Sequence, residues 1–275
     1  MIIYNRKEIK QEHFGDGTLK AEVPENLSNV DMFSIVGSFF GAASESITWC
    51  YDNDAEIFTL NCLVDAIRDV KGNNVNIELR MPYIPHARQD RKVSGRFFTL
   101  KTFAKIINQM NFSKVVVLDP HSDVATALID RCCQMLKPIE ALTVGTVLMY
   151  PDAGAAKKYK SDTTAIIGNK KRDKDGNIVS YELLNFIEGT ESVTIVDDIV
   201  SYGGTFVEAA KALRERGVKN IFLIVSHCED NIEKGKVFEY IDKVYTTDSI
   251  CHLPESDKLE YITHYNFRDV VKDED

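Results

Sequence analysis

Short runs of β-branched and other apolar residues alternate along this chain with longer stretches in which apolar residues recur three and four positions apart. The short runs predict strands over residues 75–81, 115–118, 147–150, 193–196 and 221–225. The longer stretches predict helices over residues 58–69, 99–109, 124–135, 205–216 and 259–265. Strands that alternate with helices are typical of α/β proteins with a largely parallel sheet, so we expect that fold class.

Two of the predicted strands lead into similar segments, VVVLDPHSD at 115–123 and VTIVDDIVS at 193–201. Each places an aspartate where the strand meets the following loop. This similarity suggests two related halves, and we expect domains over residues 1–130 and 131–275. A coincidence between two buried strands is the alternative. Ligands of open α/β sheets gather at the carboxyl ends of strands, so we expect chemistry near these aspartates.

The composition, with 44% apolar and 27% charged residues, is that of a folded globular protein and excludes intrinsic disorder. A net charge of −9 argues against a general nucleic-acid-binding surface. No apolar run approaches the roughly 18 to 20 residues that span a bilayer, so we expect no membrane segment. The opening segment MIIYNRKEIK carries charges where a secretory signal is apolar, and the 6 cysteines lack metal-site spacing. We therefore expect a cytoplasmic protein with free thiols.

The predicted strand 193–196 leads through two acids and a glycine-rich turn into the predicted helix 205–216. The segment comprises Asp197, Asp198, Ser201, Tyr202, Gly203, Gly204 and Thr205. Glycines let backbone N–H groups approach an anion, hydroxyls add donors, and a helix N-terminus adds partial positive charge, so the turn predicts a phosphate site. We expect the paired carboxylates to face ribose hydroxyls or a divalent metal. A capped turn with solvated acids is the alternative.

Six segments carry a resemblance to a known family. They are FGDG at 14–17, MPYIPHARQDRK at 81–92, VVVLDPHSD at 115–123, PDAGAAKK at 151–158, NKKRD at 169–173 and VTIVDDIVSYGGT at 193–205. In order and spacing they resemble the ribose-phosphate pyrophosphokinase family. The resemblance implies two similar phosphoribosyltransferase-like domains, each a mainly parallel sheet flanked by helices, with an ATP site in the first and a ribose-phosphate site in the second. It also implies transfer of the diphosphoryl group of ATP to the anomeric hydroxyl of ribose 5-phosphate, with release of AMP.

By this resemblance Arg88, Gln89 and Asp90 bind ATP. Guanidinium groups beside an amide suit triphosphate oxygens and a purine edge; a surface ion-pair cluster is the alternative. Phe14 and Asp16 resemble the family's adenine-binding pair, which a neighbouring subunit supplies. The resemblance therefore implies self-association, while a plain hairpin turn is the alternative for this short segment.

The resemblance also implies a magnesium ion. His121 resembles the histidine that binds ATP and its magnesium, where a lone histidine after a strand is more often part of a turn. Asp152 resembles a second metal-binding position close to the ribose, with a helix cap as the alternative.

The polar, glycine-flanked segment 168–177 predicts a mobile loop. By resemblance its Lys170 and Arg172 are catalytic, together with His121, and they stabilise the charge of the transferring group. Lys171 lies between the two, so the register can differ by one residue.

One departure from the family suggests another acceptor. Where the family has a run such as Asp-Thr-Ala-Gly-Thr, this chain has Ser-Tyr-Gly-Gly-Thr from Ser201 to Thr205. The loss of a carboxylate and the gain of a phenol, with an altered N-terminal region, allow an alternative acceptor that is larger than ribose 5-phosphate. ADP-ribose, in NAD salvage, is our example. A non-catalytic associated subunit is a further alternative, and a phosphoribosyltransferase acting on a base leaves the ARQDRK segment without a task.

Overall fold

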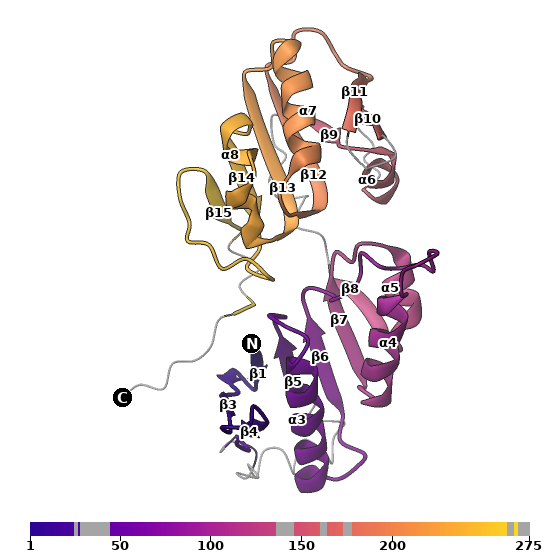
Figure 1. Ribbon diagram of the computed structural model, residues 1–275, viewed down its shortest axis with the longest axis vertical. Coiled ribbons are helices and arrows are strands. Elements are labelled where there is room, and N and C mark those ends of the chain that lie inside the picture. The colour runs from indigo at the N-terminus through magenta and orange to yellow at the C-terminus, as the bar shows by residue number, and fades with distance from the viewer. Residues whose placement is uncertain are drawn as a thin grey trace, which may run out of the picture. The chain divides into compact units, whose positions relative to one another are not determined.

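The computed structural model describes residues 1–24, 27, 45–135, 146–159, 164–172, 178–262, 267 and 268. The chain divides into two compact units, Met1–Leu136 with Phe267–Asp275 and Lys137–Asn266. Each unit contains its own sheet, drawn with its helices in Figure 1. Both sheets are mainly parallel and are accompanied by helices, so the predicted fold class is confirmed.

The first unit contains a six-stranded sheet with the order β2-β1-β5-β6-β7-β8. Its strands are β1 (Ile2–Tyr4), β2 (Lys7–Glu8), β5 (Glu45–Trp49), β6 (Ile77–Met81), β7 (Lys114–Leu118) and β8 (Cys132–Met135). The strands β5 to β8 are parallel, whereas β1 runs antiparallel to β2 and β5. A separate hairpin pairs β3 (Gln11–His13) with β4 (Leu19–Ala21). The boundary of this unit lies beyond residue 130 because β8 is the last strand of its sheet.

The helices of the first unit are α3 (Glu56–Lys71), α4 (Thr99–Gln109) and α5 (Asp123–Leu128). α3 buries Leu60, Leu63, Val64 and Ile67, the three-and-four spacing that predicts a helix with one apolar face. These residues share a core with Trp49 and the other buried residues of the sheet. Helix packing on the sheet therefore leaves the loops at the carboxyl ends of its parallel strands as the positions for polar function.

The second unit contains a seven-stranded sheet with the order β11-β10-β9-β12-β13-β14-β15. Its strands are β9 (Val147–Tyr150), β10 (Ile166–Arg172), β11 (Ile178–Leu184), β12 (Ser192–Val200), β13 (Asn220–Cys228), β14 (Lys243–Thr246) and β15 (Leu259–Tyr261). Only the β10–β11 pair among these neighbours is antiparallel. Its helices are α6 (Ala153–Lys158), α7 (Gly204–Glu215), the 3₁₀ turn η2 (Asp230–Lys234) and α8 (Val237–Tyr240).

Three sequence-based expectations about secondary structure are wrong. The helix predicted over 124–135 stops at Leu128, because Ile129 is extended and Arg131 has φ 52°, and the rest forms β8 against β7. The helix predicted over 259–265 begins as strand β15, which pairs with β14; residues 263–265 lie outside the described residues. The loop predicted over 168–177 is strand β10 as far as Arg172, and residues 173–177 lie outside the described residues.

Within the described part of the chain, no helix is both long and apolar enough to cross a membrane. None of the 6 cysteines, all of which lie among the described residues, forms a disulfide bond.

Candidate functional site

The carboxyl edge of the second sheet brings together predicted residues from two neighbouring strands. Asp152 follows β9 and caps α6, where its Oδ1 accepts a hydrogen bond from the Ala155 N–H at 3.0 Å. Lys170 lies on β10, and its Nζ is 2.7 Å from Asp152 Oδ2. The candidate metal ligand and the candidate catalytic lysine therefore form one ion pair.

The Asp152 carboxyl group is ionised at neutral pH. Burial favours its neutral form, but the hydrogen bonds from Lys170 and from the Ala155 N–H outweigh burial and hold the pKa below its usual value. Asp152 therefore both caps α6 and places a negative charge at this edge of the sheet.

Asp197 and Asp198 lie within strand β12, rather than in the loop after it as the sequence predicts. Loss of solvent around the Asp197 carboxyl and the adjacent charge of Asp198 raise its pKa well above the ordinary value, and Asp152 adds to this effect. Asp198 Oδ2 lies 3.9 Å from the Nζ of Lys158 at the end of α6. The edge thus gathers three carboxyl groups and two lysines within one unit.

The glycine-rich turn after β12 has a backbone that requires glycine. Gly203 has φ 75° and is the N-cap of α7, and a Cβ built there meets Val237 Cγ2 at 2.0 Å. The backbone oxygen of Tyr202 lies equally close to where a Cβ would stand on Gly235, while the Tyr202 side chain is 57% exposed. The turn therefore presents the first N–H groups of a 12-residue helix, with Ser201 and Thr205 beside them.

Arg172 is the last residue of β10, and its backbone pairs with Ile178 of β11. The predicted loop thus begins on a paired strand, two residues beyond Lys170. Tyr181 of β11 supports this region, because its hydroxyl donates to the Pro151 carbonyl at 2.9 Å and leaves no room for a side chain at Gly168.

In the first unit, the predicted ATP residues follow neighbouring parallel strands. Arg88 and Gln89 lie in the exposed turn after β6, and Thr99 Oγ1 donates to Gln89 Oε1 at 2.9 Å. His121 is exposed after β7. The Leu118 N–H donates to the Pro82 carbonyl at 3.1 Å, which joins the beginnings of the two segments. Asp90 contacts Arg91, with its Oδ1 3.9 Å from Nε.

The FGDG segment is a hairpin turn between β3 and β4. Asp16 Oδ1 accepts hydrogen bonds from the Thr18 N–H at 3.0 Å and the Thr18 hydroxyl at 2.7 Å, and these lower the pKa of Asp16. Phe14 is 55% exposed. The local structure thus turns an aromatic ring outward from a fixed hairpin.

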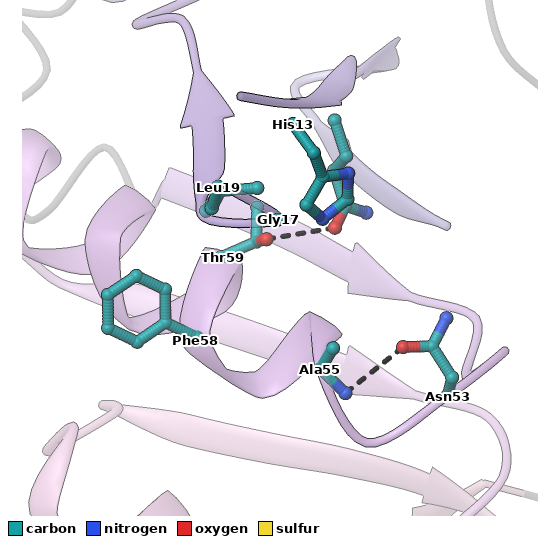
Figure 2. Close-up of a pocket in the computed structure, with 8 residues that line it drawn as sticks. His13, Gly17, Leu19, Asn53, Ala55, Phe58 and Thr59 are labelled. Atoms are coloured by element: carbon teal, nitrogen blue, oxygen red, sulfur yellow. Dashed lines mark hydrogen bonds between the residues drawn. The ribbon is translucent and has the colours of Figure 1, made fainter. Parts of the chain in front are cut away.

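A cavity of about 380 Å³ lies between this hairpin and the start of α3 (Figure 2). It is lined by Gln11, His13, Gly17, Leu19, Asn53, Ala55, Phe58 and Thr59. Thr59 Oγ1 donates to Gln11 Oε1 at 2.9 Å and joins the hairpin to α3. The sequence does not predict this cavity, because its residues come from separate segments without a shared motif. Nor does it predict a role for Lys158, a lysine at a helix end.

Comparisons with known proteins agree with the fold. A family model described as the N-terminal domain of ribose phosphate pyrophosphokinase matches residues 3–110. The ribose-phosphate pyrophosphokinase of Thermosipho africanus is 26% identical over 91% of this chain and 80% of its own length. That of Vibrio cholerae is 28% identical over 86% of this chain and 77% of its own length.

The crystal structure of phosphoribosylpyrophosphate synthetase from Mycobacterium smegmatis has a TM-score of 0.71 to this chain. The match covers 93% of this chain and 85% of that one, with 18% sequence identity, so it is a likeness of fold. The family model covers residues 3–110 of the first unit, and the matches to the curated relatives extend over 86% to 91% of the chain. Over most of its length the chain is similar to ribose-phosphate pyrophosphokinases, and its residues 3–110 match the model of their N-terminal domain.

Proposed function

We propose that this chain transfers the diphosphoryl group of ATP to the anomeric hydroxyl of ribose 5-phosphate, giving 5-phosphoribosyl 1-diphosphate and AMP. The observation that carries the proposal is the edge of the second sheet. There Asp152, Lys170 and the Asp197–Asp198 pair gather beside the turn that opens α7. An anion cradle next to carboxylates suits a sugar that has a phosphate at one end and hydroxyls at the other.

In this proposal the turn binds the 5-phosphate of the sugar. The N–H groups at the start of α7 and the hydroxyls of Ser201 and Thr205 donate hydrogen bonds to it, and Gly203 lets the backbone approach it. Asp197 and Asp198 accept hydrogen bonds from the ribose hydroxyls. The sugar is thereby held at both ends, with its anomeric hydroxyl oriented for attack on the β-phosphorus.

Lys170 and Arg172 stabilise the negative charge of the transferring group. In the structure Lys170 is paired with Asp152 at 2.7 Å, so it must leave this carboxylate before its charge acts on a phosphate. The chain's own groups act here by positioning and charge neutralisation, as in other phosphoryl transfers, and no covalent nucleophile takes part.

On the first unit, Arg88, Gln89 and Asp90 bind ATP, and Phe14 and Asp16 contact the adenine bound by a neighbouring copy of the chain. The exposed ring of Phe14 on a fixed hairpin supports this role. His121 is exposed in the loop after β7, which pairs with β6, and in this proposal it contacts the phosphates with their metal.

Two magnesium positions are proposed: His121 of the first unit binds the magnesium of ATP, and Asp152 of the second unit is a second metal-binding position close to the ribose. No group of three His, Cys, Asp or Glu side chains suited to a metal occurs among the described residues. Mg²⁺ in nucleotide sites commonly takes one or two protein ligands together with phosphate oxygens and water, and the ionised Asp152 fits such a site. When bound, the ion supplies charge neutralisation on the polyphosphate.

ADP-ribose is a second candidate acceptor, and the Tyr202 side chain favours it. This ring is 57% exposed next to the turn that is proposed to bind phosphate, where it can stack on the further part of a larger acceptor. The role of a non-catalytic associated subunit is less well supported, because Lys170, Asp152 and the Asp197–Asp198 pair are all present and form one cluster.

The test is AMP release from Mg-ATP with ribose 5-phosphate, with ADP-ribose and without any sugar, with each product identified by mass spectrometry. AMP formed with ribose 5-phosphate supports the first acceptor. A pyrophosphorylated product from ADP-ribose alone supports the second and contradicts the first. No sugar-dependent AMP with either acceptor contradicts the proposed activity, and the associated subunit then becomes the better interpretation.

A further inference from the structure

Lys158 contacts the acidic pair of β12 from the end of α6. Its Nζ lies 3.9 Å from Asp198 Oδ2, and the two side chains are only 19% and 8% exposed. The N-cap of the same helix is Asp152, and α6 also contacts β9, β10 and β12. One six-residue helix therefore connects the Asp152–Lys170 ion pair to the cation beside Asp198.

Two tyrosines fix the position of the Lys158 ammonium group. Its Nζ lies 5.1 Å from the centroid of the Tyr159 ring, where a cation is attracted to the π face. The Tyr159 ring stacks on Tyr150 of β9 with their centroids 6.3 Å apart, and the Tyr150 hydroxyl donates to the Tyr159 carbonyl at 3.1 Å. The lysine is thus anchored to the sheet rather than extended into solvent.

The two lysines of the cluster lie at different distances from their carboxylates. Lys170 donates a hydrogen bond to Asp152 at 2.7 Å. Lys158 is 3.9 Å from Asp198, which is within ion-pair distance but longer than a hydrogen bond. An ionised carboxylate accepts several hydrogen bonds, so a cation at this distance compensates the charge of Asp198 while a sugar hydroxyl donates to it. A largely buried carboxylate without such a cation is strongly disfavoured in its ionised form.

We propose that Lys158 is a positioning residue for the acceptor sugar: its positive charge lies beside the Asp198 carboxylate and orients this carboxylate toward the ribose hydroxyls. This inference rests on the proposed function. Lys158 acts through Asp198 and does not itself touch the substrate. The neighbouring Lys157 is exposed on the same turn of α6 and provides a matched control.

The experiment compares Lys158→Met, Lys158→Arg and Lys157→Met. KM and kcat come from AMP release with whichever acceptor the wild-type chain uses, and Kd for the sugar comes from calorimetry without ATP. We expect Lys158→Met to raise KM and Kd for the sugar by roughly 10- to 100-fold, with KM for ATP changed less than about threefold. Lys158→Arg should recover most of this loss, and Lys157→Met should stay within about twofold of wild type.

A double-mutant cycle with Asp198→Asn tests whether Lys158 acts through Asp198. We expect Lys158→Met to change the sugar Kd of the Asp198→Asn variant by less than about threefold. Losses that multiply, or a Lys158→Met variant that binds sugar like wild type, overturn the inference. Thermal unfolding verifies the fold of each variant, and Lys158→Gln replaces Lys158→Met in the cycle if the latter does not fold.

The wild-type chain separates the two ways of failing. Wild type with neither sugar-dependent AMP release nor sugar binding contradicts the proposed function, and the inference falls with it. An active wild type with an unchanged Lys158→Met variant contradicts the role of Lys158 alone.

Discussion

The two sheets present their candidate residues in different ways. At the edge of the second sheet the charged side chains contact one another: Lys170 pairs with Asp152, and Lys158 lies beside Asp198. At the edge of the first sheet Arg88, Gln89 and His121 are exposed on turns. The residues of the second unit are therefore held by one another before any ligand binds, whereas those of the first unit are exposed to solvent.

This difference indicates how each region responds to substitution. Removal of one member of a contacting, half-buried cluster leaves the other members unbalanced, and the loss is large. Removal of an exposed side chain leaves no buried charge unbalanced, and the loss is smaller. We therefore expect the largest effects in the second unit and the smallest in the first.

The largest expected effect is on catalysis by Lys170. Lys170→Ala should lower kcat by roughly 100- to 1,000-fold, because it removes the positive charge that is proposed to stabilise the transferring group. The Kd for ATP should stay within about threefold of the wild-type value. AMP release and ATP binding by calorimetry measure the two quantities. Lys171→Ala, which changes an exposed residue, is the control. A larger kcat loss in Lys171→Ala than in Lys170→Ala would mean that Lys171, and not Lys170, is the catalytic lysine.

The second prediction concerns the turn that opens α7, where we expect a large loss of stability. Gly203→Ala combines a backbone at φ 75° with a Cβ contact of 2.0 Å to Val237, so we expect it to lower the free energy of unfolding by about 3 kcal/mol. Gly217→Ala is the matched control, because Gly217 has φ 85° but nothing within 4 Å of where its Cβ would stand. It should lose only about 1 kcal/mol. Equal losses in urea titrations of the two variants mean that the Val237 contact contributes nothing.

Asp197 should show a conflict between stability and binding. Its pKa is raised by loss of solvent and by Asp198, so the folded state is favoured below the unfolded pKa of roughly 3.9 and loses stability as the pH rises toward the folded value. We expect Asp197→Asn to raise the free energy of unfolding by on the order of 1 kcal/mol at pH 7 and by little near pH 4, while it weakens sugar binding. Unfolding titrations at both pH values, with the exposed Asp69→Asn as control, measure this. A gain independent of pH contradicts the assigned cause.

Much of this arrangement can be predicted from the sequence where one periodicity dominates. The helix predicted over 99–109 has the bounds of α4, and the helix predicted over 205–216 differs from α7 by one residue at each end. The helix predicted over 124–135 is wrong because the apolar residues of this segment fit a helix and a strand equally well. The pairing of β8 with β7 decides in favour of a strand for its second half.

The site shows the same limit of prediction. The motif around Asp197 predicts that the acidic pair belongs to a functional site. The Asp152–Lys170 contact, in contrast, depends on the pairing of β9 with β10, which no local sequence pattern indicates. Lys158 cannot be singled out from the sequence because a lysine in the last turn of a helix ordinarily faces solvent. The stacked rings of Tyr150 on β9 and Tyr159, which follows α6, hold it near Asp198.

The smallest expected effect is at Phe14 in the first unit, and it tests whether exposure there reflects a missing partner chain. Phe14→Ala should raise KM for ATP by roughly 5- to 10-fold, through loss of a stacking contact, with kcat and sugar affinity little changed. Phe58→Ala, another exposed phenylalanine of the same unit, is the control. Steady-state AMP release measures both.

A mixing experiment distinguishes a ring that acts on its own chain from one that acts on a neighbour. A Phe14→Ala chain retains Lys170, and a Lys170→Ala chain retains Phe14. If adenine is contacted across two copies, mixed assemblies contain some sites with both residues intact, and at low ATP the mixture should be more active than the sum of the separate variants. Additive activities at every ATP concentration mean that Phe14 serves its own chain or none. ATP binding by the first unit would then need no partner chain, and the contrast between the two units would lie only in how the side chains are held before ATP binds.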